Sequence, residues 1–327
     1  MNAYFMIVLV SILLFFVVWL FGLLLEKLSH ASLNVTRKPG SRAWYVLVGP
    51  GVALHESSHA LGCVLTRTEI VEFKPINVSV QGDQVLLGYV KYVNPPSTLK
   101  RTIINLAPVG ISLILLTFFA LGATYLIPDT HLGGEAIALL QNLIGLKNDP
   151  IVLADMYGPL NMIGSFVFDF FYTFAGLTVI NPLFWIVAFL AMTIMFSSAP
   201  SDVDIKNALP GLKFLLLFEM IWLVLAAVYP PIGWLLPGVF ELAAVMFALA
   251  LGFTAIAYGF FIMITAMGML KTPFNFIPFI ATLLTGYVLA TYYPLMFSLA
   301  MQTIISVAVF VAVAVPLLLA KSLRSES

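Results

Sequence analysis

The sequence predicts an all-α polytopic membrane protein with about eight transmembrane helices and a small β hairpin or sheet after the second. Of its 327 residues, 61% are hydrophobic and only 9% are charged. Soluble domains carry far more charge than this. Several uninterrupted apolar stretches also reach the ~20 residues that a helix needs to cross a bilayer. We therefore expect a lipid bilayer around the protein, and the zero net charge gives no reason to expect nucleic-acid binding.

The predicted spans follow one another at 4–25, 44–65, 102–127, 180–199, 212–229, 239–268, 274–293 and 295–320. The first span has no basic region before it and is too long for a signal peptide, so we expect it to be retained. With the N-terminus in the cytoplasm, the inner loops hold ten Lys and Arg residues against five in the outer loops. This bias predicts the orientation. Glu241 borders an outer loop and is expected to be solvated.

Two segments depart from the helical pattern. Residues 69–93 are rich in β-branched and aromatic residues, and the turn signal QGDQ lies midway, so we expect a hairpin or small sheet. An exposed edge there would capture an unwound peptide as an added strand, whereas a closed hairpin would only cover its neighbours. The apolar stretch 160–179 carries Asp169 and fits an interfacial helix or a ninth, partial span.

The second span contains VALHESSHALG, which places His55, Glu56 and His59 within an apolar run. Histidines four residues apart share one helix face, and Glu56 lies to its side. This is the H-E-x-x-H arrangement of zinc metalloproteases. In such a site, neutral imidazoles can bind Zn²⁺ without cancelling its charge, and the ion lowers the pKa of a bound water towards ~7. A carboxylate that is not a ligand can then take and pass on the proton.

The alternative interpretation is that these three side chains only serve helix contacts. An ionisable group at bilayer depth costs at least ~2.5 kcal/mol, and such groups usually mark function. A helix contact accounts for one histidine but hardly for all three residues. We therefore favour a metal site, with Glu56 as the catalytic base.

Two histidines and a water leave one protein ligand to be found. The best candidates are Asp202 and Asp204, at the inner end of the fourth span, where they could meet the second span. Ser201-x-x-Asp204 is also a capping box, so Asp204 has a structural explanation too. Glu219 in the fifth span and Asp169 remain less favoured alternatives. From these residues alone, the choice between the two aspartates stays open.

Several motifs occur in an informative order. The H-E-S-S-H span is followed by Leu87-Gly88-Tyr89-Val90, by Asn105-Leu106-Ala107-Pro108 at the next span, and by Pro200-Ser201-x-x-Asp204. Over residues 44–206, this order resembles the site-2 protease family of intramembrane zinc metalloproteases, in the branch with a Pro-Ser-x-x-Asp signature. Better-known members carry Asn-x-x-Pro-x-Pro-Leu-Asp-Gly, whereas Ile205 follows Asp204 here.

The resemblance implies one zinc ion held by His55, His59 and Asp204. It also implies cleavage of a transmembrane protein substrate near the cytoplasmic side. The chain then divides into a first helix with its outer loop (1–43), a three-span metalloprotease core (44–210) and a C-terminal region of four helices (211–327).

Two other functions compete with proteolysis. A transporter or metal permease would also hold intramembrane histidines and acids, but the sequence has no inverted repeat with paired broken helices. A non-catalytic relative that binds membrane helices would have no use for Glu56. The sequence therefore favours the protease.

Overall fold

Most of the chain is helical in the computed structural model, which describes residues 2–36, 42–77, 79–81, 84–86, 88–126, 132–148, 153–180, 183–199 and 201–326. Long apolar runs satisfy their backbone hydrogen bonds within each helix, as a bilayer requires. The helices are α1 (Ala3–Thr36), α2 (Arg42–Thr66), α3 (Thr98–Leu126), α4 (Leu132–Gly145), α6 (Gly158–Ile180), α7 (Leu183–Ser198), α8 (Asp202–Val228), α9 (Val239–Met269), α10 (Ile277–Tyr292) and α11 (Leu299–Glu326). Short 3₁₀ turns occur at η1 (Leu146–Asn148), η2 (Pro230–Trp234) and η3 (Phe274–Phe276).

Six helical segments in the described part of the chain are long and apolar enough to cross a membrane. They are Ala3–Leu25, Thr98–Phe119, Val203–Val228, Val239–Gly268, Phe274–Tyr292 and Met301–Ala320. Each corresponds to a predicted span, which supports a multi-pass membrane protein. The predicted total of eight is not confirmed. The apolar part of α7, Trp185–Ser198, is shorter than a span, and α2, although a continuous helix, is not among these six segments of the described residues.

The segment after α2 forms short antiparallel strands, as its β-branched residues predict. Strand β1 (Ile70–Lys74) pairs with β4 (Tyr89–Tyr92), and β2 (Ser79–Gln81) pairs with β3 (Gln84–Leu86). The register of the second pair matches Gln81 with Gln84, on the two sides of the predicted turn. Strands β1 and β4 both contact α2, so the sheet lies against the helix of the H-E-x-x-H motif.

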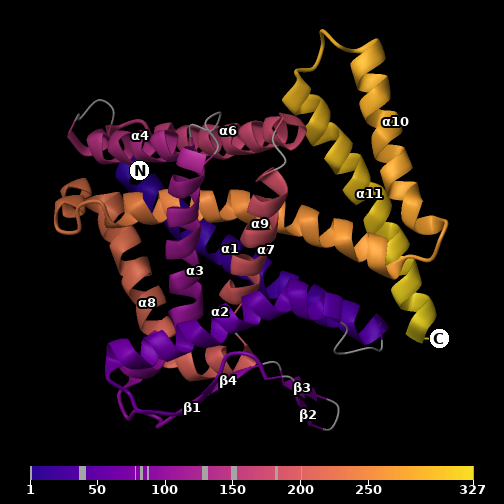
Figure 1. The fold of residues 1–327 in the computed structure, drawn as a ribbon. Helices are drawn as coiled ribbons and strands as arrows, with labels where there is room; N and C mark the ends of the chain where they lie inside the picture. The colour runs from indigo at the N-terminus through magenta and orange to yellow at the C-terminus, as the bar shows by residue number, and fades with distance from the viewer. Residues whose placement is uncertain are drawn as a thin grey trace.

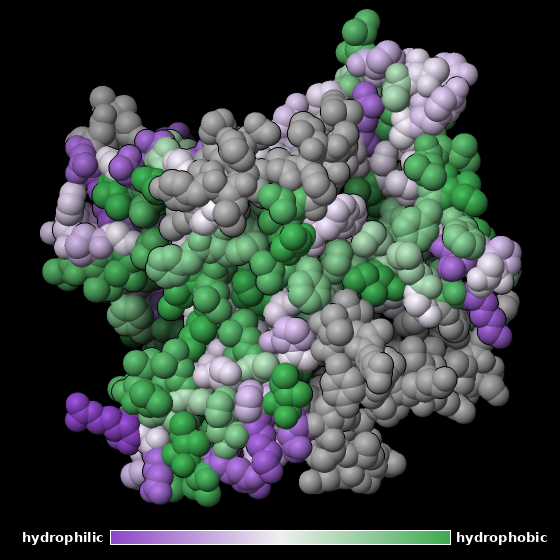
Figure 2. Space-filling model, in the orientation of Figure 1, coloured by the Kyte–Doolittle hydropathy of each residue, from purple (hydrophilic) through white to green (hydrophobic). Residues whose placement is uncertain are grey.

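Helix α3 is central to the arrangement. It contacts α2, α7, α8 and α9, and Figure 1 shows it between α2 with the sheet at one end and α4 at the other. Helices α1 and α9 lie side by side across the bundle. Helices α10 and α11 pack mainly on each other, and α11 also touches α6 and α9. Figure 2 shows apolar residues over the middle of this face and hydrophilic residues gathered below, around the sheet.

The segment 160–179 forms most of α6 but is not among the membrane-length helices in the described residues. Asp169 is exposed on α6. One face of α6 is nevertheless buried, with Phe166, Phe170 and Phe174 packed in the core against α9, and Figure 1 shows α6 beside α4. Asp169 is therefore on the exposed face of α6 and is not grouped with the two histidines of α2.

The expectation that Glu241 is solvated was wrong. Its side chain is fully buried at the start of α9 and forms an ion pair with Lys147 of η1, which is also buried. The Lys147 ammonium lies 3.3 Å from the Gly233 carbonyl oxygen and 4.8 Å from the centre of the Tyr4 ring. A buried carboxylate needs such a partner because its desolvation is costly. The pair thus joins α1, η1, η2 and α9.

Candidate metal centre

Three predicted ligand side chains meet at one point. Helix α2 carries His55 and His59 one turn apart, and their Nε2 atoms are 3.1 Å from each other. The Asp204 carboxylate comes from the first turn of α8, with Oδ2 3.4 Å from His55 Nε2 and Oδ1 3.2 Å from His59 Nε2. His59 and Asp204 are buried, and His55 is nearly so. This cluster could hold a metal ion.

Each histidine is oriented by a backbone carbonyl behind it. His55 Nδ1 lies 3.0 Å from the Ser197 oxygen at the end of α7, and His59 Nδ1 lies 2.8 Å from the Ile104 oxygen on α3. A carbonyl only accepts hydrogen bonds, so each Nδ1 carries a proton and donates it. In a neutral ring, Nε2 is then left with a lone pair, which is the form that binds a metal.

The resulting set of donor atoms fits a cation. Two Nε2 lone pairs and a carboxylate face one another across 3.1–3.4 Å in a buried space. Without a positive charge between them, these groups repel one another. Ligands about 2.0–2.1 Å from a tetrahedral zinc ion would lie ~3.4 Å apart. The observed separations are close to this value, and a His₂-carboxylate set with an open fourth position is typical of catalytic zinc.

Asp204 is held by its own helix cap. Ser201 is the N-cap residue of α8, and its hydroxyl both accepts from the Asp204 backbone N–H and donates to Asp204 Oδ2 at 2.7 Å. The Ser201 backbone N–H donates to the same oxygen at 2.8 Å. The two explanations that the sequence offered for this aspartate, cap and ligand, are therefore compatible in the fold.

The other candidate acids do not join the cluster. Glu219 lies four turns further along α8, about 22 Å from Asp204 along the helix axis. Asp169 is exposed on α6. The side chain of Asp202 lies outside the described residues. Among the described residues, only His55, His59 and Asp204 bring three potential ligand atoms within 4.8 Å of one another.

Glu56 is half-buried beside this cluster without being part of it. It faces the start of β4: a Cβ added to Gly88 would lie 2.9 Å from Glu56 Cγ and 2.7 Å from the Pro75 carbonyl oxygen. Only glycine allows the backbone to come so close. Glu56 thus lies between the His55–His59–Asp204 cluster and the sheet, which is a suitable place for a base that is not a ligand.

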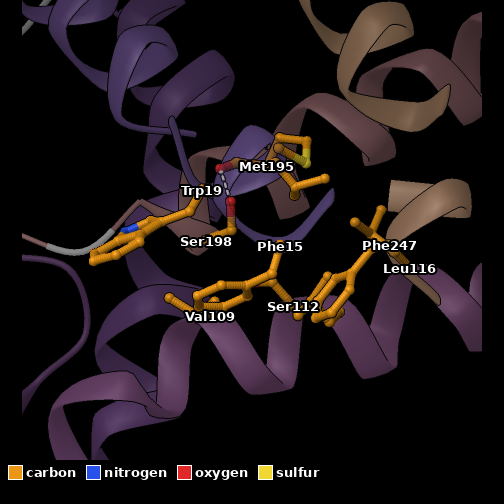
Figure 3. A pocket seen from close by; sticks show the side chains of 10 residues that line it. Phe15, Trp19, Val109, Ser112, Leu116, Met195, Ser198 and Phe247 are labelled. Atoms are coloured by element: carbon orange, nitrogen blue, oxygen red, sulfur yellow. Dashed lines mark hydrogen bonds between the residues drawn. The ribbon is translucent and has the colours of Figure 1, made fainter. Parts of the chain in front are cut away.

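A small cavity lies behind the His55 anchor, between α1, α3, α7 and α9. It measures about 10 Å³, room for about one water molecule, and no metal-ligand residue lines it. Figure 3 shows Ser112 and Ser198 at its wall, with the Ser198 hydroxyl donating to the Met195 carbonyl at 2.7 Å. The Ser112 hydroxyl donates to Ser197 Oγ at 3.2 Å, so α3 also holds the residue that anchors His55.

Charged residues gather on the sheet next to the site. The Glu72 carboxylate forms ion pairs with Lys74 and Lys91 and accepts a hydrogen bond from the Tyr89 hydroxyl. The bond from Lys74, followed by those from Tyr89 and Lys91, lowers the pKa of Glu72 from 4.5 to about 2. Because this cluster is open to solvent, it fixes local side-chain geometry and contributes little to global stability.

Comparison with protein-family models, with curated proteins and with solved structures gives no match for this chain. The functional argument therefore depends on the residues and their geometry.

Sequence analysis missed several groups that hold the site. The carbonyls of Ile104 and Ser197 have no side-chain signature, so no pattern could have revealed them. Asn105 was named only as part of a motif, without a role, and Ser112 was overlooked, although a polar residue in an apolar span is itself a signal. Ser201 was recognised as part of a helix cap and of the Pro-Ser-x-x-Asp signature, but not as a hydrogen-bond partner of the Asp204 carboxylate at the site.

Proposed function

We propose that this protein is a zinc-dependent intramembrane metalloprotease. The convergence of His55, His59 and Asp204 from two distant helices carries the proposal, since it supplies a catalytic type of ligand set. Glu56, beside the ligands, acts as general base and acid. The resemblance to site-2 proteases in motif order points to the same reaction.

The protein's own residues have distinct tasks in this proposal. His55 and His59 hold one zinc ion through Nε2, each kept in the right tautomer by its carbonyl partner. Asp204 completes the site and is kept in place by Ser201. Zinc, when bound, acts as a Lewis acid that makes water more acidic and polarises a peptide carbonyl. Glu56 takes a proton from the attacking water and delivers it to the leaving amine nitrogen.

The substrate in this proposal is a transmembrane segment of another protein. A peptide bond in a membrane helix is hydrogen-bonded internally, so the segment must unwind before cleavage. Strands β1 and β4 contact the helix that carries Glu56 and pair only with each other among the described strands. An unwound segment added to the outer edge of this sheet would lie next to the base. We place the site towards the cytoplasm, from the Lys and Arg bias, and count α2 and α7 among eight spans.

The first test is metal content. We expect one zinc ion per chain in the purified protein, and none after His59→Ala or Asp204→Asn. Asp169→Asn is the matched control, because it removes an acid that is exposed and does not belong to the cluster. A wild-type protein without zinc affinity would contradict the proposal.

The second test is cleavage. A synthetic membrane-spanning peptide with a central glycine-proline break and a fluorophore-quencher pair is reconstituted with the protein in phosphatidylcholine vesicles. Glu56→Gln should keep zinc and lose cleavage, whereas Glu219→Gln, on α8, should keep both. Equal cleavage by wild type and Glu56→Gln would exclude Glu56 as the base. Zinc flux into the vesicles without cleavage would favour the permease instead.

A further inference from the structure

We propose that Asn105 of α3 is a positioning residue for the metal centre, acting through Asn207 of α8 and Tyr92 of β4. The inference rests on the proposed function, because it concerns the ligands of the same zinc site. No ligand atom comes from Asn105 itself. Its amide instead joins the three elements that carry or adjoin Asp204, the His59 anchor and Glu56.

Asn105 is 2% exposed and lies within a membrane-length helix. Its Nδ2 donates to the Arg101 carbonyl at 2.7 Å and to the Tyr92 hydroxyl at 3.2 Å. Its Oδ1 accepts from Asn207 Nδ2 at 3.4 Å. The Arg101 carbonyl can only accept, which fixes the orientation of the amide. A buried amide is costly unless it is paired, and here both ends have partners.

The link to α8 ends at Asn207, close to Asp204 in the same helix. Asn207 lies three residues after Asp204, so the two side chains share one face of the helix. The hydrogen bond between the two asparagines therefore fixes the first turns of α8 against α3 on the side where the ligand projects. Ser201 holds the Asp204 side chain relative to α8, and Asn105 holds α8 relative to the histidines.

The other two links reach His59 and Glu56. Ile104, the neighbour of Asn105, offers the carbonyl that orients His59. Tyr92 lies at the end of β4, whose beginning follows Gly88, the residue packed against Glu56. One amide thus ties together the backbone behind a ligand, the helix of a second ligand and the strand beside the base.

The hydrogen bonds at position 105 require an amide side chain, which both donates and accepts. Leucine has nearly the same shape but neither donor nor acceptor, so it would leave Asn207 Nδ2 and the Tyr92 hydroxyl without this partner. Aspartate could still accept from Asn207 Nδ2 and from the Tyr92 hydroxyl. It has no N–H to donate to the Arg101 carbonyl, however, and it would add a negative charge near Asp204. Loss of a partner that orients a metal site typically lowers metal affinity 10–100-fold.

The test compares zinc affinity in the full-length protein by competition with a chelator of known zinc affinity. Asn105→Leu should bind zinc 10–100-fold more weakly than wild type. Asn207→Leu should act in the same direction, and the double variant should be no weaker than the weaker single variant, because the two act through one bond. Thr117→Val is the matched control. Its hydroxyl also lies on α3 but bonds only to the Leu113 carbonyl of its own helix.

Unfolding of the metal-free proteins separates positioning from general stability. If Asn105 only stabilises the fold, Asn105→Leu lowers the melting temperature and leaves the zinc affinity of the folded protein unchanged, which would overturn the inference. If Asn105→Leu does not fold, Asn207→Leu and Tyr92→Phe are measured in its place. Wild-type zinc affinity in both would overturn the inference equally. These results differ from failure of the proposed function, in which the wild type itself binds no zinc.

Discussion

Gly211 of α8 offers a sharp test of how α3 sets the distance between the metal ligands. A Cβ built at Gly211 would lie 1.9 Å from Thr102 Oγ1, 2.5 Å from Thr102 Cγ2 and 2.6 Å from Thr102 Cβ. No rotation of the threonine side chain relieves the last contact, because Cβ is fixed to the backbone. Gly211→Ala therefore forces α3 and α8 apart.

The required shift can be worked out from these distances. Ordinary contacts begin at 3.4 Å, so Thr102 Cβ must retreat by about 0.8 Å. Overpacking of this kind typically costs about 1–3 kcal/mol, partly offset by the ~1 kcal/mol that alanine gains over glycine in a helix. Metal–ligand distances in a well-formed site lie within about 0.2 Å of their ideal values, so a shift of this size is large for a ligand. Asp204 lies two turns before Gly211, so we expect zinc affinity to fall at least ~10-fold.

The assay is zinc competition with a chelator, together with thermal unfolding of the metal-free protein. In the double variant Gly211→Ala/Thr102→Gly, the Thr102 side chain that would clash with the new Cβ is absent. The helices can then keep their wild-type distance, and zinc affinity should return to within about threefold of wild type. Thr102→Gly alone serves as the control, since the Thr102 hydroxyl bonds only to the Thr98 carbonyl. Normal zinc affinity in Gly211→Ala, or no recovery in the double variant, would refute the idea that this contact sets the ligand spacing.

Three further predictions concern single side chains. Glu56→Gln should retain zinc but lose about 10²–10⁴-fold in peptide cleavage, measured by fluorescence; undiminished cleavage would exclude it as the base. Ser201→Ala should lower the free energy of unfolding by ~1 kcal/mol and zinc affinity by ~10-fold, with Ser201→Thr as the control that keeps the hydroxyl; unchanged values would contradict its capping of Asp204. The pKa of Glu72 lies below its ordinary value, so its ion pairs stabilise the sheet above pH 4.5 and are lost as the pH falls through about 2. An NMR titration should place the wild-type midpoint there, and Lys74→Gln should raise it; an unchanged midpoint in the variant would rule out this pairing.

Apolar patterning predicted the helices well and their relation to the membrane less well. Six predicted spans recur as membrane-length helices, because long apolar runs have few alternatives to a helix. The count is uncertain at α2 and α7, for different reasons. The polar run from His55 to His59 lowers the hydropathy of α2, and the apolar part of α7, Trp185–Ser198, is short. Apolar patterning therefore gives an unreliable number of spans where polar residues lie within an apolar run or where the run is short.

Long-range pairing accounts for the error at Glu241. From its place beside a loop, the side chain was expected to face water. The structure instead brings Lys147 to it from a distant turn, and both are buried. No local pattern reveals such a partner, because the pairing depends on how η1 packs against α9. The histidine pair on α2 was predictable for the opposite reason, since helical spacing alone brings the two rings together.

The choice between Asp202 and Asp204 could not be made from the sequence, whereas the structure places Asp204 beside the two histidines. Spacing could not decide it, because the side chain that faces α2 depends on where α8 begins. With Ser201 as N-cap, Asp204 becomes the third residue of the helix and its carboxylate turns back towards the cap. A carboxylate has about four lone-pair sites, so Oδ2 can accept from Ser201 while Oδ1 remains directed at His59. The first turn of α8 therefore also positions the carboxylate that we propose as the third ligand. This predicts that the ligand set is already in place before zinc binds.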